Sequence, residues 1–307
     1  MLNFTLKQLK YIEAAGRLGS IANAASELNI SQSSIAASIG SLERQIGFDL
    51  FVRTPAKGIS VTPAGQETLL LIRNFIAQSR QFESEIMAVG GDDTGFVRIA
   101  CYATAAPSFL PPILKNFRAS YPHTSVKFLE GNMDTIMDFL NNGEADLVFT
   151  YSETMHERQN FTPLFSAPPY VLLPADDPLA NGTSVDFHQL AGKPMIMLDL
   201  PHTTAYFTEL FEAVGLTPNI VHSTRSTEIL RALVSGGHGY TLLNICPPDY
   251  QPNDSRFRAL PLRGAVKVPI FGIVTLADMR QPNIVKAFIE RCLDLKTTGI
   301  FDAITVR

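Results

Sequence analysis

The sequence has few cysteines, no apolar run long enough to span a membrane, and little net charge. Its three cysteines, Cys101, Cys246 and Cys292, are too few and too scattered for a disulfide framework or a zinc site, which favours a reducing cytoplasm. Because no run of about 18 apolar residues exists, we expect no transmembrane helix and no membrane partner. The first ten residues lack the apolar middle and the cleavage site of a secretion signal.

Composition and length indicate a folded chain of two or three domains. The apolar share of 46% and the charged share of 18% are typical of globular proteins, and 307 residues exceed one ordinary core. The net charge of −4 is unevenly distributed: residues 1–65 carry six Lys and Arg against four Asp and Glu, whereas residues 91–307 carry 17 against 22. A slightly basic head is compatible with DNA binding, and ordinary scatter is the alternative.

Residues 5–47 have the pattern of three short helices. Their starts are marked by polar capping residues, namely Thr5 with Gln8, Ser20 and Ser31. Apolar residues of the third helix recur at i, i+4, i+7 and i+11, at Ile35, Ile39, Leu42 and Ile46. Together with small residues in the second helix, this pattern predicts a helix-turn-helix, although a plain three-helix bundle remains open.

A two-stranded wing is predicted after the third helix. Residues 50–53 and 59–61 have strand character on either side of a Lys57-Gly58 turn. Arg53 and Lys57 would then touch phosphates, which position a protein on DNA but do not specify the sequence. On the third helix, Gln32 is the side chain able to bond an adenine edge with two hydrogen bonds.

Residues 6–65 resemble the winged helix-turn-helix of LysR-type transcriptional regulators. The matching pieces stand in the family order: AA in the second helix, NISQS at the turn, SLE near the end of the third helix, IGFDLFVR in the wing and VTPAG after it. Five positions depart from the family pattern, with Ser33 in place of a proline, Ala36-Ala37 in place of polar residues, and Gly40-Ser41 in place of basic ones. We therefore expect base contacts from Gln32, Ser33, Ser34 and Ser38. The resemblance implies DNA binding, but it does not carry over the sequence specificity.

Residues 64–89 contain no proline and are predicted to form one long helix. Its residues Thr68, Ile72, Phe75, Ser79, Phe82, Ile86 and Val89 are spaced like a coiled-coil seam. The alternative is a helix that packs on its own domain. The resemblance implies a dimerisation helix, with Ile72, Phe75, Phe82 and Ile86 as its main contacts. A homodimer or homotetramer on a pseudo-palindromic operator follows from that.

Strands and helices alternate from residue 96 to the end of the chain, which predicts an α/β body of mainly parallel sheets. We divide the chain into a winged helix-turn-helix domain at 1–63, a linker helix at 64–90 and an effector-binding body at 91–307. The resemblance implies a body like type 2 periplasmic binding proteins. Its lobe I is expected at about 91–165 and 267–307, and its lobe II at about 166–266.

Several polar residues follow strands or open helices where ligands bind in open α/β sheets. They are Thr104, Asn132, His202, Thr203 and Ser226, with Thr104 singled out by the resemblance. Ordinary helix capping is the alternative, particularly for Thr204 and Ser226. Arg225 can pair with a carboxylate or face solvent. Aromatic residues nearby, Tyr102, Tyr151, Tyr206 and Phe207, suggest a ligand with an apolar part or are simply core residues.

The body contains no motif of nucleotide binding, nucleophilic catalysis or metal binding, so neither an enzyme nor a cofactor is expected. The resemblance implies a transcriptional regulator whose operator contacts are modulated by a small effector, bound between the lobes. A carboxylate with an apolar part is the expected effector. The alternative is a ligand-binding module with lost or weak transcriptional output. Cys101, Cys246 and Cys292 are expected to be structural and not a redox switch.

Overall fold

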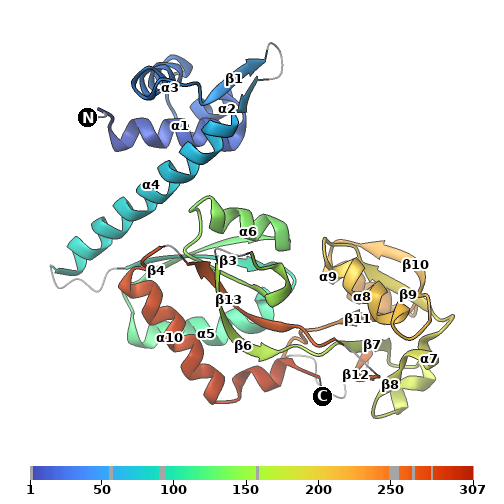
Figure 1. Ribbon diagram of the computed structural model, residues 1–307. Helices are drawn as coiled ribbons and strands as arrows, with labels where there is room; N and C mark the ends of the chain where they lie inside the picture. Colours follow the sequence, from blue (N-terminus) through green and yellow to red (C-terminus); the bar gives the residue numbers. More distant parts are fainter. Residues whose placement is uncertain are drawn as a thin grey trace. The chain divides into compact units, whose positions relative to one another are not determined.

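We analysed a computed structural model, which describes residues 3–54, 58–89, 95–156, 159–248, 256–264, 267–277 and 279–306. The chain divides into two compact units, Met1–Asp92 and Asp93–Arg307. The elements of the first unit are α1 (Leu6–Leu18), α2 (Ile21–Glu27), α3 (Gln32–Ile46), β1 (Phe51–Thr54), β2 (Gly58–Val61) and α4 (Pro63–Val89) (Figure 1).

The first unit is a winged helix-turn-helix, as predicted. Thr5, Ser20 and Ser31 cap the three short helices, and Thr5 forms the complete capping box with Gln8. The apolar stripe of α3 is buried with Ala24 and Ala25 of α2, where small side chains let the helices approach. Asn29 adopts a left-handed conformation in the turn between α2 and α3. The pattern of local caps and of apolar spacing therefore specifies this domain.

The wing is fastened to the helices by polar side chains at its base. The Glu43 carboxylate of α3 accepts hydrogen bonds from the backbone N–H groups of Leu50, at 2.8 Å, and Phe51, at 3.3 Å. The Thr62 hydroxyl donates to the Asp49 carbonyl at 2.8 Å and accepts from the Gly65 N–H at 2.9 Å. A side chain at Gly65 would lie 2.2 Å from the Leu50 carbonyl oxygen, so this position needs glycine. Glu43 of the SLE segment and Thr62 and Gly65 of the VTPAG segment therefore hold the base of the wing in place.

Helix α4 has two different apolar faces. Leu69, Ile72 and Ile76 are buried in the core of the head. Leu71, Phe75, Phe82 and Ile86 lie within about 60° of one another around the helix axis, and they are exposed. We call this second set the α4 stripe. The prediction of Ile72 as a dimer contact is wrong, because Ile72 is 5% exposed and is used by the head itself.

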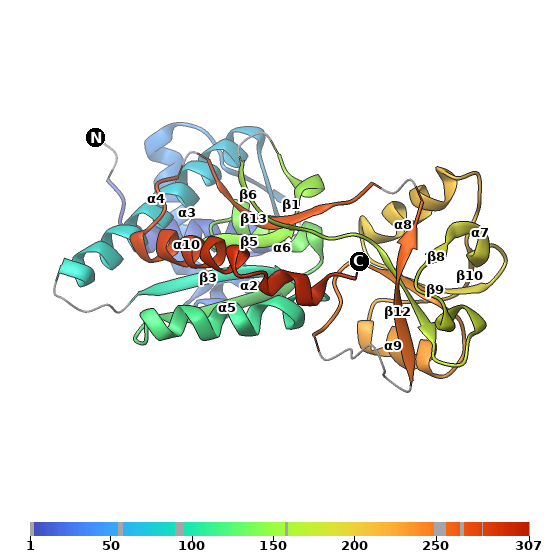
Figure 2. The ribbon, with the colours of Figure 1, turned by 90° about the horizontal axis from the view of Figure 1, so that it is seen from below.

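The second unit consists of two α/β lobes (Figure 2). The elements of lobe I are β3 (Phe96–Tyr102), α5 (Ala106–Ser120), β4 (Ser125–Gly131), α6 (Met133–Asn141), β5 (Leu147–Tyr151), η1 (Ser152–Thr154), β6 (Gln159–Ser166), β13 (Ile270–Leu276), α10 (Asn283–Thr297) and η3 (Ile300–Ile304). Those of lobe II are β7 (Tyr170–Pro174), η2 (Pro178–Asn181), β8 (Val185–Asp186), α7 (Phe187–Leu190), β9 (Pro194–Leu198), α8 (Thr203–Glu212), β10 (Asn219–Thr224), α9 (Thr227–Ser235), β11 (Thr241–Leu243) and β12 (Phe257–Arg263).

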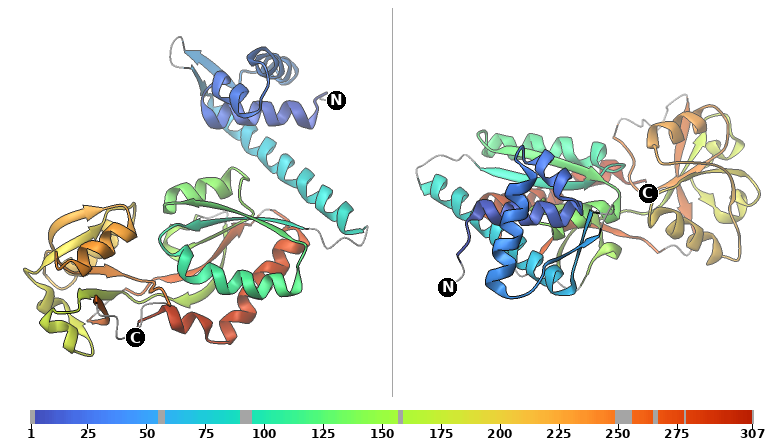
Figure 3. Two further views of the ribbon diagram at one scale, coloured as in Figure 1. Left: turned by 180° about the vertical axis from the view of Figure 1, so that it is seen from behind. Right: turned by 90° about the horizontal axis from the view of Figure 1, so that it is seen from above.

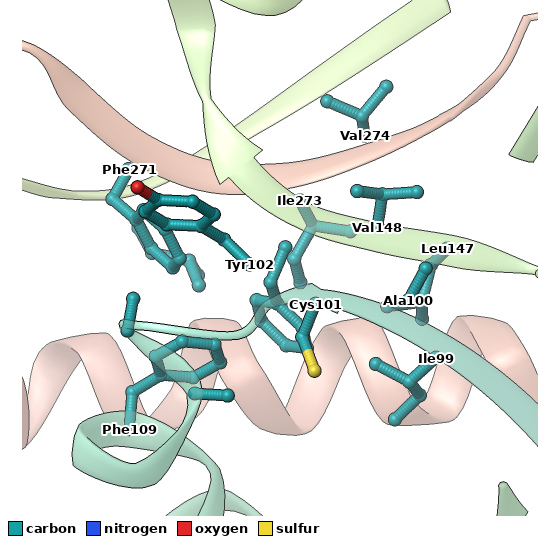
Figure 4. Packing of buried hydrophobic residues seen from close by; sticks show 14 of the residues in the cluster. Ile99, Ala100, Cys101, Tyr102, Phe109, Leu147, Val148, Phe271, Ile273 and Val274 are labelled. Atoms are coloured by element: carbon teal, nitrogen blue, oxygen red, sulfur yellow. The ribbon is translucent and has the colours of Figure 1, made fainter. Parts of the chain in front are cut away.

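Lobe I is built on a five-stranded sheet in the order β4-β3-β5-β13-β6. Helix α6 covers one face of this sheet, and α5 and α10 cover the other (Figure 3). Buried residues of β3, β5 and β13 meet Phe109 of α5 in its core (Figure 4). The prediction of mainly parallel sheets is wrong here, because β13 pairs antiparallel with both β5 and β6. Strand β13 comes from the far end of the chain and enters the sheet in the reverse direction.

Lobe II buries both faces of its strands. Val171 and Leu173 of β7 pack toward α8, whereas Tyr170 and Leu172 pack toward α9. This alternation follows from the two-residue period of a strand. Its larger sheet has the order β11-β7-β12-β8, with antiparallel and parallel pairs, and β9 pairs in parallel with β10. The lobes are joined by the segment after β6 and by the segment before β13 (Figure 2).

Among the described residues, no helix combines the length and the apolarity that crossing a bilayer requires.

Candidate functional site

The N-terminal half of α3 presents polar side chains to solvent. Gln32 and Ser33 are exposed and Ser34 is half-buried. The Ser31 hydroxyl, which caps the helix, lies 2.9 Å from the Ser33 hydroxyl and 2.8 Å from the Ser34 hydroxyl. These residues form one polar corner at the helix start. Ser38 does not belong to it: it is 6% exposed, and its hydroxyl donates to the Ser34 carbonyl at 2.8 Å. The prediction of Ser38 as a base contact is therefore wrong.

Arg44 is a basic residue on this surface that the sequence reasoning missed. It is exposed in the last turn of α3, and its guanidinium lies beside Gly40. Ser33, Ala37, Gly40 and Arg44 have the same i, i+4, i+7, i+11 spacing as the buried stripe, which places them together on one exposed face of α3. This spacing could have identified Arg44 from the sequence. Arg53 lies in β1, but its side chain is outside the described part, and Lys57 lies outside the described residues altogether.

A cavity of about 100 Å³ lies between the two lobes of the second unit. Lobe I supplies the end of β3, the starts of α5 and α6, and η1; lobe II supplies α8, α9 and the end of β11. The lining residues are Tyr102, Thr104, Ala105, Met133, Tyr151, Glu153, Thr154, Leu198, His202, Thr203, Tyr206, Phe207, Thr227, Arg231, Leu243, Asn244, Ile245 and Pro269. The structure thus brings Thr104, His202 and Thr203 together around one space.

The start of α8 makes two side-chain contacts with lobe I beside this cavity. The hydroxyls of Tyr102 and Thr203 lie 2.9 Å apart in a buried position. Nearer the solvent, His202 Nε2 lies 2.7 Å from an Asp134 oxygen of α6, with both side chains more than half exposed. His202 holds the left-handed conformation that begins α8, with φ of 65°. The predicted ligand residues His202 and Thr203 are therefore also lobe contacts.

Asn132 and Ser226 do not line the cavity. The Asn132 side chain caps α6 by accepting from the Thr135 N–H at 3.0 Å, and the Ser226 hydroxyl caps α9 by accepting from the Ile229 N–H at 3.3 Å. For these two residues, the capping alternative describes the observed contacts, and their role in effector binding stays a prediction. Arg225 is exposed and is not part of the lining either.

The cavity has charged and aromatic walls. Glu153 of η1 and Arg231 of α9, which the sequence reasoning missed, both line it. Arg231 stands one turn after Thr227, at a spacing that places both on one helix face. All four aromatic residues named from the sequence, Tyr102, Tyr151, Tyr206 and Phe207, line the cavity as well.

Burial raises the pKa of several side chains of this unit. It raises the pKa of Tyr206 to about 12; the hydrogen bond with Asn244 lowers this pKa, and the nearby Glu153 charge raises it further. Burial likewise raises the pKa of Cys101 to about 12 and of Cys246 to about 11. All three cysteines are buried and free. Among the described residues, no group of three metal-ligating side chains is found.

Comparisons with known proteins agree with both units. Residues 6–66 match the family model of bacterial regulatory helix-turn-helix proteins of the lysR family, and residues 90–296 match that of the LysR substrate binding domain. The chain is 27% identical over 299 residues to the HTH-type transcriptional regulator cbl of Klebsiella aerogenes, covering 95% of this chain and 92% of that protein.

Solved structures show the same arrangement of elements. HinK, a LysR family transcriptional regulator from Pseudomonas aeruginosa, is 30% identical in sequence. Its structure matches over 95% of this chain and 98% of the HinK chain, with a TM-score of 0.60. The structure of full-length CbnR in complex with its target DNA is similar in fold, with a TM-score of 0.56 at 22% identity over 95% of this chain and all (100%) of that one.

Proposed function

Because this chain belongs to the LysR family of DNA-binding transcriptional regulators, we propose that the cavity between its lobes is where a small effector binds and modulates its operator contacts. The observation that carries this proposal is the cavity itself, which both lobes line and which their contacts bridge. A molecule bound there interacts with both lobes at once, so it favours one lobe arrangement over another. A ligand changes an equilibrium only through such unequal binding.

We propose an effector with a carboxylate and an apolar part. Two helices begin at the cavity, α5 after Ala105 and α8 after His202, and neither start has a side-chain cap or an acidic residue in its first turn. The N–H groups of Thr203 and Thr204 donate to the Leu200 carbonyl, so each start acts on an anion mainly through the positive end of the helix dipole. Apolar side chains such as Met133, Leu198 and Ile245 complete the walls.

For the DNA-binding unit, we propose that Gln32, Ser33 and Ser34 contact bases, while Arg44, Arg53 and Lys57 contact phosphates. We also propose that the α4 stripe pairs with that of a second copy, giving a homodimer or a homotetramer. The stripe exposes large apolar side chains along one narrow face, as a two-helix seam requires. Two-fold pairing then favours a pseudo-palindromic operator with half-sites separated by whole helical turns.

Fluorescence anisotropy with DNA from upstream of the protein's own gene tests this function. The full-length chain should bind in a salt-dependent manner, and small carboxylates should change the affinity for DNA. Thr104→Val keeps the side-chain volume but removes a hydroxyl from the cavity, so it should weaken the effector response by about 1–3 kcal/mol and leave effector-free DNA binding unchanged. Failure of the wild-type chain to bind any such duplex at low salt would favour a ligand-binding module without transcriptional output.

A further inference from the structure

The cavity exposes one acidic and one strongly basic side chain from different lobes. Glu153 stands in lobe I and Arg231 in lobe II. In the described part of the chain, no ion pair joins the two. Arg231 Nη1 lies 3.2 Å from Glu228, whose side chain is 84% exposed, and the Glu153 carboxylate accepts from the Ser152 hydroxyl at 3.1 Å. A molecule in the cavity therefore meets both charges.

The negative charge of Glu153 affects side chains of both lobes. After the larger effect of burial, its negative charge helps to raise the pKa of Tyr151 in lobe I and of Tyr206 in lobe II. Glu153 is exposed and lines the same cavity as both tyrosines. Among the lining residues, Glu153 is the one acid, so it disfavours an effector that carries only negative charge.

Arg231 and the start of α8 provide the opposite preference. The Arg231 side chain is 16% exposed, and Thr227, one turn earlier on α9, lines the same cavity. Guanidinium groups bind carboxylates strongly because their N–H groups match the two oxygens. Lobe II thus favours an anionic group, whereas Glu153 of lobe I favours a cationic one.

We propose that the cavity binds a small zwitterion of the α-amino acid class, with its carboxylate held by Arg231, near the positive end of the α8 dipole, and its ammonium group facing Glu153. This inference rests on the proposed function, because it specifies the chemistry of the effector at that site. A short aliphatic or thioether side chain fits against Met133 and Leu198.

Calorimetry on the full-length chain with matched ligands tests this specificity. The probes are valine, leucine and methionine. Each amino acid is compared with two analogues: the carboxylic acid that lacks the α-amino group, and the amino-acid amide, in which the carboxylate is replaced. At least one amino acid should bind about tenfold more tightly than both of its analogues, because each analogue lacks one of the two interactions with a charged side chain of the cavity. In Glu153→Gln, the ratio between the amino acid and its amine-free analogue should fall toward one.

Glu209→Gln is the matched control, because Glu209 is an exposed carboxylate of α8 that does not line the cavity. It should keep the wild-type ratio. Arg231→Gln should weaken the amino acid and the amine-free carboxylate alike, with circular dichroism confirming that the variant is folded. Equal binding of amine-free carboxylates and amino acids by the wild type overturns the inference but leaves an anionic effector in place. Absence of binding by every amino acid of the panel at millimolar concentration overturns it as well, whereas loss of DNA binding concerns only the proposed function.

Discussion

Serine residues of α3 show how one turn of helix separates a surface role from a core role. Ser34 and Ser38 are four residues apart and have the same side chain. Ser34 is half-buried at the polar helix start, whereas the Ser38 hydroxyl bonds back to the Ser34 carbonyl inside the head. Such back-bonding satisfies a buried hydroxyl without any external partner. Residue type alone therefore cannot assign DNA contacts on this helix.

Gln32→Ala and Ser38→Ala should behave differently in operator binding. Removing the Gln32 amide should cost about 1–3 kcal/mol at one base position and relax the preference there, because an exposed bidentate donor and acceptor is lost. Ser38→Ala should leave base preference unchanged, because its hydroxyl is used inside the head. Anisotropy titrations with singly substituted operators measure both effects. An unchanged preference at all positions in Gln32→Ala would remove Gln32 from the proposed interface.

Cys246 should make the stability of the chain depend on alkaline pH. Burial raises the pKa of its thiol from the ordinary 9.0 to about 11 in the folded chain. The stabilisation is complete below pH 9 and is lost as pH rises toward 11, because only the unfolded chain releases the proton in that window. The free energy of unfolding should fall by about 1.4 kcal/mol per pH unit for this thiol.

Urea unfolding of the wild type and of Cys246→Ala between pH 8 and 11 measures this effect by difference. Other groups that titrate in the same range contribute equally to both proteins, so the wild type should show the steeper decline. Parallel curves for the two proteins would mean that the thiol ionises equally easily in the folded chain.

At the scale of the element, α4 has two apolar faces, one buried in the core of the head and one exposed. The spacing of its apolar residues predicted the long helix and the three exposed residues Phe75, Phe82 and Ile86. It also placed Ile72 in the same seam, because a heptad pattern does not reveal that another face is already covered by α1. Phe75 itself meets the ring of Phe4 edge-on at a centroid distance of 6.2 Å. Which face is free depends on tertiary contacts that no local pattern contains.

Phe82→Glu and Ile72→Ala should separate assembly from folding. A charge at Phe82, which is 63% exposed, should reduce the oligomer in sedimentation velocity without lowering the stability of the head. Ile72→Ala should lower the free energy of unfolding by about 2–5 kcal/mol, because it opens a cavity in the core of the head. An unchanged sedimentation coefficient in Phe82→Glu would show that the α4 stripe is not the seam between copies.

At the scale of the whole molecule, the sequence predicted the α/β class and the strands next to helices, but not the long-range pairing. Strands β6 and β12 were missed, since neither is followed by a helix and both include proline. The antiparallel entry of β13 depends on contacts between residues more than 100 positions apart. The cavity was predicted only in part. Thr104 and Thr203 follow strand ends, and Glu153, which follows β5 in the same way, was overlooked. Arg231 lies inside α9 and comes close to the others only through the fold.

Tyr102→Phe tests how strongly the lobes are held together in the absence of an effector. The substitution removes the buried hydroxyl that meets Thr203 at 2.9 Å, and it leaves the Thr203 hydroxyl without that partner. The amides at the start of α8 should therefore exchange about tenfold faster, corresponding to a loss of about 1.4 kcal/mol. Hydrogen exchange with mass spectrometry on the full-length chain detects this change, with Tyr240→Phe as a control in the core of lobe II. Equal exchange at α8 in the wild type and Tyr102→Phe would show that the lobes are held by other contacts.

The buried thiols have a practical consequence for measuring the distance between the two lobes. Cys101, Cys246 and Cys292 are all buried, and burial raises the pKa of each, so the reactive thiolate is scarce near neutral pH. Cysteines introduced at exposed positions on the two lobes would react with fluorescent maleimides far faster than the native thiols. The natural chain can thus carry a donor and acceptor dye pair without prior removal of its own cysteines, and the distance between its lobes becomes measurable one molecule at a time.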